Sequence, residues 1–167
     1  MSCEYVERTL RELLYKPEYL GSVSLSRLRS IFSSLSQSEL EECIKKLIKN
    51  GRGWELSGGY LVNREVVSDI LYNEKARLQR RLNECQEKIS VLEEEANTLE
   101  EIRRIWLENP MLKGRVSVMV KIYVNSRLSE EVIDLRDKIS RIEKESVDIE
   151  RLLREIESKI ENSYRPP

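Results

Sequence analysis

The sequence predicts a mostly α protein with minor β structure, in which a small N-terminal domain precedes long helices forming a coiled coil or a helical hairpin. Apolar residues recur at alternating three- and four-residue spacing over two segments between residues 82 and 160, as in helices that pack along a seam. The first third instead contains short helical and strand patterns separated by turns. Charged residues make up 35% of the chain and aromatic residues 6%, which suits long solvated helices.

The N-terminal domain is expected to span residues 1–63. Apolar residues at helical spacing predict a first helix that Pro17 and Gly21 close and a second one around Leu28, with a short extended stretch at residues 22–24 between them. The clearest local signal is Ser36-Gln37-Ser38-Glu39, a capping box in which serine and glutamate satisfy each other's backbone amides. It predicts a third helix of about residues 37–49, which ends at Asn50-Gly51.

Residues 54–62 predict a β-hairpin. Gly58-Gly59 supplies the two positive-φ positions of a tight turn, which places Leu56 opposite Leu61. The resulting order of helix, short strand, helix, helix and two-stranded wing resembles the winged helix-turn-helix superfamily over residues 3–63. The resemblance implies that the third helix enters the DNA major groove with its N-terminal residues nearest the bases.

The charge pattern departs from that of a DNA-binding winged helix. Glu39, Glu41 and Glu42 occupy the first turns of the third helix, and the wing has no Lys or Arg. Residues 1–63 contain nine Lys and Arg against eight Asp and Glu, so we expect weak, salt-sensitive duplex binding. An ordinary solvated helix surface is the alternative for the basic residues. The candidate nucleic-acid contacts are Lys45, Lys46, Lys49, Arg64, Arg77, Arg80 and Arg81.

Two long helices are predicted at residues 64–109 and 128–162. Asn109-Pro110 ends the first one, because the residue before proline is forced out of the helical region. Each apolar seam needs cover from another helix. Equal lengths around a breaker favour an antiparallel hairpin, whereas two parallel helices from two chains and a dimeric four-helix arrangement are the alternatives. We expect a homodimer through the coiled coil.

The connection at residues 110–127 is expected to be β-like. Every even position from 116 to 124 is Val or Ile, a period of two that predicts a strand at residues 115–125. A strand must pair, and the candidates are the wing, its own copy across a dimer axis, or a protein partner's edge. The expected oligomer interface comprises Leu82, Cys85, Ile89, Leu92, Leu99, Trp106, Val116, Val118, Val120, Ile122, Val124, Leu128, Val132, Leu135, Ile139, Ile142, Ile149, Leu153, Ile156 and Ile160.

Signatures of catalysis are absent from the sequence. There is no histidine, no phosphate-binding glycine loop and no cluster of metal-binding carboxylates, so we expect no enzyme activity, cofactor or metal. Three widely spaced cysteines cannot form a zinc site, and Cys43 and Cys85 are expected to be small buried hydrophobes. The absence of histidine and the abundance of charge hint at a thermophile.

The charge and hydropathy of the chain indicate in which compartment the protein works. Lys plus Arg number 29 against 30 Asp plus Glu, so the whole chain presents no basic field toward nucleic acid or anionic lipid. No apolar run approaches ~18 residues. We therefore expect a soluble cytoplasmic protein with no membrane association, and a flexible tail at residues 163–167.

The expected function is that of a non-enzymatic dimer. Its long helices would hold two winged-helix domains in a DNA- or transcription-associated assembly. The alternative is a protein-interaction adaptor or scaffold, in which the winged helix and the strand at residues 115–125 bind protein rather than DNA. Glutamates at the start of the third helix favour that alternative.

Overall fold

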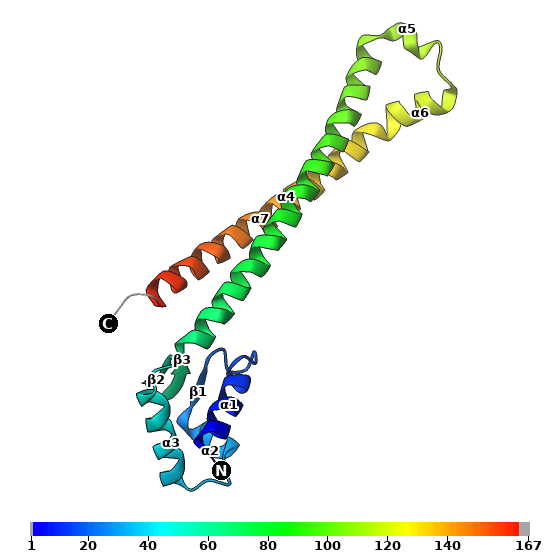
Figure 1. Cartoon of the computed structure of the whole chain (residues 1–167). Helices are drawn as coiled ribbons and strands as arrows, with labels where there is room; N and C mark the ends of the chain where they lie inside the picture. Colours follow the sequence, from blue (N-terminus) through cyan, green and yellow to red (C-terminus); the bar gives the residue numbers. More distant parts are fainter. Residues whose placement is uncertain (1, 164–167) are drawn as a thin grey trace. The chain divides into compact units, whose positions relative to one another are not determined.

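Figure 1 shows a computed structural model of the chain, which describes residues 2–163. It is mostly helical with one small antiparallel sheet, which confirms the predicted class. Of the tail expected at residues 163–167, Ser163 is the last residue of a helix, and residues 164–167 lie outside the described residues. The elements are α1 (Cys3–Leu14), β1 (Ser22–Ser24), α2 (Leu25–Ile31), α3 (Gln37–Lys49), β2 (Trp54–Ser57), β3 (Tyr60–Asn63), α4 (Arg64–Glu108), α5 (Pro110–Lys113), α6 (Val118–Ser126) and α7 (Leu128–Ser163).

The described chain divides into two compact units. Residues 2–76 and 155–163 form the first, here named the N-terminal unit, and Arg77–Arg154 form the second, here named the hairpin unit. Both α4 and α7 contribute residues to each unit. None of the described helices combines the length and apolarity that crossing a membrane requires.

The N-terminal unit contains the predicted order of helix, strand, helix, helix and hairpin. Its three strands are antiparallel in the order β1-β3-β2. Gly58 and Gly59 both have positive φ, and Leu56 pairs with Leu61 as predicted. The predicted capping box is also present at the start of α3. The fully buried apolar core side chains of this unit are Val6, Leu10, Leu14, Leu28, Leu47, Leu61 and Val66.

The first turns of α4 are part of the N-terminal unit, because hydrogen bonds tie them to it. The fully buried Asn63 donates through Nδ2 to the Arg52 carbonyl (3.2 Å) and accepts at Oδ1 from the Val66 amide (3.1 Å). The hydroxyl of Tyr15, the C-cap residue of α1, donates to Asp69 at 2.5 Å. These bonds extend the unit past the boundary expected at residue 63.

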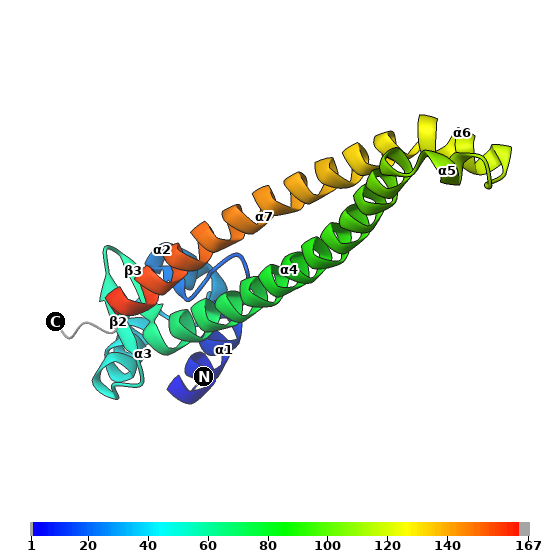
Figure 2. The same cartoon turned by 90° about the horizontal axis from the view of Figure 1, so that it is seen from above.

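The hairpin unit pairs α4 with α7 in opposite directions, side by side in Figures 1 and 2. Arg136 of α7 donates to Asn97 (2.9 Å) and Glu100 (3.1 Å) of α4, and Arg81 of α4 pairs with Glu145 of α7 at 2.7 Å. These contacts define an antiparallel hairpin within one chain, the arrangement that the equal helix lengths favoured.

The strand predicted at residues 115–125, in the connection between the long helices, is wrong. Those residues form the end of a loop and helix α6, and no strand in the described part of the chain pairs with them. The side chain of Ser117 caps α6 by accepting from the Val120 amide. A helix satisfies its own backbone, whereas a lone strand leaves its amides and carbonyls unpaired. Leaving those backbone groups unpaired costs more than the low helix propensity of Val and Ile, which is less than about 1 kcal/mol per residue.

Tertiary contacts fix the position of α6. Val124 is buried against Trp106 of α4 and Leu128 of α7. The ring N–H of Trp106 donates to the Asn125 side chain at 3.1 Å. One side of α6 therefore packs against both long helices, where the sequence pattern had suggested an alternating strand.

The cysteines give a second correction. Cys3 of α1 and Cys43 of α3 form a disulfide with their Cα atoms 5.3 Å apart, so Cys43 is not the free buried side chain that was expected. Contact between α1 and α3 brings together two positions 40 residues apart, a proximity that sequence spacing does not reveal. Cys85 is free and buried, as predicted.

Candidate interaction surfaces

The exposed face of α3 is divided by charge. Its first turns carry carboxylates and its later turns carry lysines, and this arrangement stabilises the helix because each charge interacts favourably with the helix dipole. The hydroxyl of Ser36, followed by its backbone amide, lowers the pKa of the Glu39 carboxyl by hydrogen bonding. The helix end that would lie nearest DNA bases therefore presents negative charge. The exposed charged residues of this face are Glu39, Glu41, Glu42, Lys45, Lys46 and Lys49.

The wing offers apolar rather than cationic side chains. Leu56 and Tyr60, on either side of its turn, are each about half exposed. Arg64, which follows the wing, is paired with Glu55 of β2 at 2.8 Å, and the hydrogen bond to this carboxylate raises the pKa of the guanidinium. Arg64 is thus partly neutralised within the N-terminal unit.

A hollow of about 320 Å³ lies beside β1, one of the two edge strands of the sheet. It brings together two tyrosine rings, a guanidinium and a carboxylate from separate segments of the N-terminal unit. A hydrogen bond with Tyr19 raises the pKa of Arg27. No sequence motif pointed to this site, because its residues converge only through the pairing of β1 with β3. The residues that line it are Glu18, Tyr19, Ser22, Val23, Ser24, Arg27 and Tyr60.

The predicted nucleic-acid residues fall into two groups. Lys45, Lys46 and Lys49 are exposed together on α3, in the N-terminal unit that also contains Arg64. The remaining three, Arg77, Arg80 and Arg81, are exposed on the part of α4 within the hairpin unit. Arg81 is occupied by its ion pair with Glu145. The structure therefore assembles the three lysines but does not place all seven residues in one unit.

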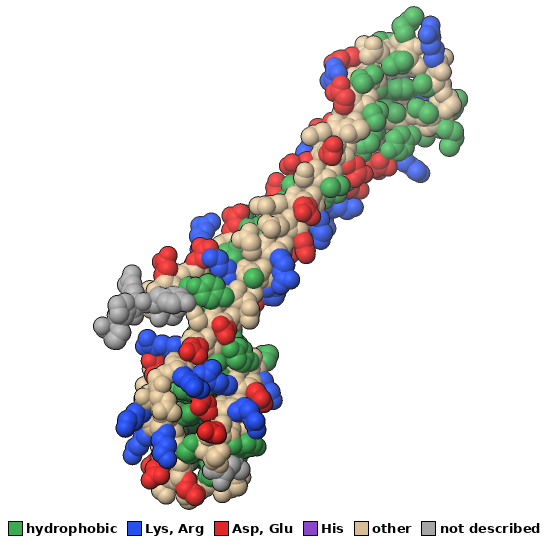
Figure 3. All heavy atoms as spheres, viewed as in Figure 1, with side chains coloured by type: hydrophobic (Ala, Val, Ile, Leu, Met, Phe, Trp, Pro, Cys, Tyr) green, Lys and Arg blue, Asp and Glu red, His purple; other side chains and the backbone are tan. Residues whose placement is uncertain are grey.

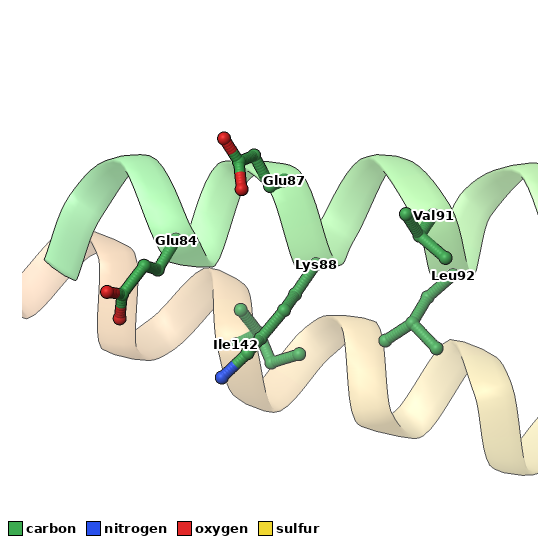
Figure 4. Close-up of a pocket in the computed structure, with 6 residues that line it drawn as sticks. All are labelled: Glu84, Glu87, Lys88, Val91, Leu92 and Ile142. Atoms are coloured by element: carbon green, nitrogen blue, oxygen red, sulfur yellow. The ribbon is translucent and has the colours of Figure 1, made fainter. Parts of the chain in front are cut away.

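The hairpin unit has its own hollow, of about 520 Å³, beside the helix seam. Figure 4 shows Lys88 reaching from α4 beside Ile142 of α7, while Leu92 points toward α7. Neither Leu92 nor Ile142 is fully buried, and Val91 is largely exposed. The seam is therefore incompletely covered here. The residues lining this hollow are Glu84, Glu87, Lys88, Val91, Leu92 and Ile142.

Most residues of the expected oligomer interface are buried by this chain itself. Those buried are Leu82, Cys85, Trp106, Val124, Leu128, Val132, Leu135, Ile139, Ile149, Leu153, Ile156 and Ile160. Those partly buried are Ile89, Leu92, Leu99, Val116 and Ile142, and those exposed are Val118, Val120 and Ile122. The homodimer was predicted because each apolar seam needs another helix to cover it. Within this chain, α4 and α7 already cover most of the seam, so the burial does not require a second chain and the homodimer stays a prediction.

Neither metal-binding geometry nor similarity to known proteins narrows the function. Among residues 2–163, no group of three or more His, Cys, Asp or Glu side chains is arranged to hold a metal ion. No protein-family model, curated protein or solved structure matches the chain. The candidate surfaces therefore rest on their own residues.

Proposed function

We propose that the protein is a non-enzymatic interaction adaptor whose N-terminal unit binds an extended segment of a protein partner. The hollow beside β1 supports this proposal because it places the rings of Tyr19 and Tyr60 next to Arg27 at the edge of the sheet. Tyrosine and arginine contribute disproportionately to the affinity of protein interfaces. β1 is an edge strand, but its Ser22 amide already donates to the Tyr19 carbonyl at 3.0 Å, so the side chains of the hollow would supply most of the contacts.

The charge pattern of the same unit favours protein over DNA as the partner. Carboxylates occupy the first turns of α3, Arg64 is paired with Glu55, and the wing presents Leu56 and Tyr60. Phosphate contacts supply most non-specific affinity for DNA, and this arrangement offers few of them. Aromatic and aliphatic side chains instead suit a desolvated protein interface.

A displayed library of extended peptides tests the proposal. Peptides selected by the full chain should bind Tyr60→Ser at least about tenfold more weakly, the loss of one aromatic anchor. Tyr5→Ser is the matched control, because Tyr5 is similarly exposed on α1 but does not line the hollow. Equal losses in the two variants, or no loss in either, would refute binding at the hollow.

Duplex DNA binding is the second candidate, favoured by the exposed Lys45, Lys46 and Lys49 on one helix. If they contact phosphates, reversing all three to Glu should abolish micromolar binding measured across a salt series. Each lost contact lowers the slope of log affinity against log salt by about one. Absence of binding by the full chain at low salt removes this candidate.

The predicted homodimer is retained as part of the proposal and is supported by the hollow in the hairpin unit. A second copy could cover Val91, Leu92 and Ile142, which this chain leaves partly or largely exposed. Sedimentation should then give twice the mass of one chain, and Leu92→Glu should return the monomer mass. A monomer at all concentrations would disprove the dimer.

We propose that the protein works in the cytoplasm of a thermophile. The disulfide between Cys3 and Cys43 would be unusual in most cytoplasmic proteins, but intracellular disulfides occur in hyperthermophiles. Thiol labelling of protein taken from its own cells tests this directly. Labelling of Cys3 without prior reduction would argue against a stable cytoplasmic disulfide.

A further inference from the structure

The balanced charge of the whole chain conceals a strongly basic segment. Residues 110–127, which connect the two long helices, contain Lys113, Arg115, Lys121 and Arg127 and no Asp or Glu. Their net charge is +4, which leaves 25 basic against 30 acidic residues, a net of −5, in the rest of the chain. The connection thus lies within the longest stretch of the hairpin unit that contains no Asp or Glu, between Glu108 and Glu130.

The same segment exposes large apolar side chains. Met111 is 81% exposed, Met119 76% and Val118 68%. Figure 3 shows hydrophobic side chains gathered over this end of the hairpin unit, where α5 and α6 lie. We name this region the tip surface, which comprises Met111, Leu112, Val118, Met119, Val120 and Ile122.

The exposure follows from how α6 is held. Val124 packs against Trp106 and Leu128, and Asn125 accepts from the Trp106 ring. A helix of nine residues that is buried through one side presents its other side chains outward. Contiguous exposed apolar patches of this kind mark interaction or membrane-binding sites in soluble proteins.

We propose that the tip surface binds anionic lipid bilayers by shallow, reversible insertion. The aliphatic side chains would enter the boundary between headgroups and acyl chains, while Arg115, Lys121 and Arg127 contact lipid phosphates. Long basic side chains can keep their charge at headgroup level while their stems lie along apolar surface. Tyr123, partly exposed and bonded through its hydroxyl to Glu131 at 2.5 Å, suits the same interfacial depth.

Charge complementarity favours lipid over the other possible occupants. A second copy of the tip surface would bring two segments of net charge +4 together, and such repulsion opposes association. A protein partner would need a shaped apolar cavity with carboxylates set around it. A fluid anionic bilayer supplies acyl chains and phosphates together without requiring a fixed complementary shape.

The tip surface lies wholly within the hairpin unit, so lipid binding there is independent of the proposed peptide or DNA binding by the N-terminal unit. It also differs from membrane spanning, for which no described helix is suited. The sequence-based expectation of no membrane association rested on the charge of the whole chain, which averages the basic connection with the acidic remainder.

Co-sedimentation of the full chain with vesicles tests the proposal. We expect binding to vesicles of phosphatidylcholine mixed with phosphatidylglycerol, little binding to phosphatidylcholine alone, and weakening of binding with salt. The triple variant Arg115→Gln, Lys121→Gln and Arg127→Gln should bind about a hundredfold more weakly, because each lost charge weakens binding about fivefold. The matched control is the triple variant Lys138→Gln, Arg141→Gln and Lys144→Gln, which changes three exposed charges along α7 in the same unit.

A second variant pair tests insertion rather than charge. Val118→Ser with Met119→Ser should lower binding about tenfold or more, because aliphatic groups leave the acyl region. Val147→Ser with Leu152→Ser is the control, since both side chains are exposed along α7 and neither lines the hollow of the hairpin unit. Circular dichroism should show unchanged helix content in every variant used for comparison.

Each outcome decides the proposal. Binding that is lost in the tip variants and kept in the controls supports it. Absence of binding to anionic vesicles overturns it and leaves the tip surface to a protein partner. Equal binding to neutral vesicles, or equal loss in the control variants, also overturns it.

Discussion

The N-terminal unit and the hairpin unit bury apolar side chains in different ways. In the N-terminal unit, three helices, three strands and the first turns of α4 share one core, and a disulfide links α1 to α3. In the hairpin unit, burial is concentrated along a seam between two helices, and a second cluster forms around Trp106. A two-helix unit has little interior, so its connection leaves methionine and valine side chains exposed. The most exposed methionine side chains are therefore found where the fold has the least interior.

Reduction of the disulfide should have the largest effect and should act on one unit. Opening a loop of 40 residues is expected to lower the free energy of unfolding of the N-terminal unit by about 4 kcal/mol. The two tryptophans allow each unit to be followed separately, since Trp54 lies in the N-terminal core and Trp106 in the hairpin unit. Thermal unfolding of Trp54→Phe and Trp106→Phe, with and without reductant, makes this measurement.

The control for that experiment is the double variant Cys3→Ser with Cys43→Ser, which should not respond to reductant. If reduction moved the Trp106 transition as far as the Trp54 transition, the two units would not unfold independently. The N-terminal unit and the hairpin unit could then not be assigned separate stabilities.

Truncation of Ile149 should affect the hairpin unit by a similar amount. Ile149 is 2% exposed on α7, and Ile→Ala in such a site costs about 3 kcal/mol through lost contacts and the cavity left behind. Val147→Ala, two residues away and 62% exposed, should change stability by less than about 0.5 kcal/mol. Urea unfolding followed by Trp106 fluorescence gives both values. Equal effects would mean that Ile149 is not buried in solution.

The success of prediction differed between these units for a physical reason. The capping box at Ser36 and the turn at Gly58-Gly59 are local signals, in which a few neighbouring residues decide the backbone. The predicted elements around them are all present. The strand predicted at residues 115–125 depended instead on a distant partner. No strand in the described chain provides one, and Trp106 and Leu128 provide packing for a helix.

The candidate sites were less predictable than the fold. The seam at Ile139 and Ile149 was visible as a heptad pattern, but whether it faced the same chain or another one could not be read from spacing. The disulfide and the hollow beside β1 both depend on contacts between distant segments. The tip surface did leave a signal, because a charge count over residues 110–127 alone shows four basic residues and no acidic ones.

Asn63 should give an intermediate effect that is confined to the N-terminal unit. Asn63→Ala removes its bonds to the Arg52 carbonyl and the Val66 amide and leaves buried polar groups unpaired. The expected cost is about 2 kcal/mol, measured by Trp54 fluorescence during urea unfolding. Asn50→Ala, at an exposed position, is the control and should cost less than about 0.5 kcal/mol. A similar loss from both would show that the two Asn63 hydrogen bonds do not persist in solution.

Two tyrosine–carboxylate pairs, one in each unit, should give the smallest effects. The Tyr15 hydroxyl donates to Asp69 and the Tyr123 hydroxyl to Glu131, each at 2.5 Å. These hydrogen bonds are the main cause that raises the pKa of each phenol above its ordinary value of 10.0. A raised pKa means that the folded state favours the protonated phenol. Its stabilising contribution is therefore complete below pH 10 and is lost as the pH rises through the folded-state pKa.

Alkaline unfolding should consequently separate the two units. Above pH 10, the Trp54 transition of the protein should fall more steeply with pH than that of Tyr15→Phe, because phenylalanine has no proton to lose. The Trp106 transition should show the same difference for Tyr123→Phe. Each substitution should leave the other unit's profile unchanged, since its tyrosine pair lies within one unit. Identical profiles for the protein and a Phe variant would mean that the corresponding hydrogen bond does not persist in solution, and an effect on both transitions would show that α4 and α7 couple the units.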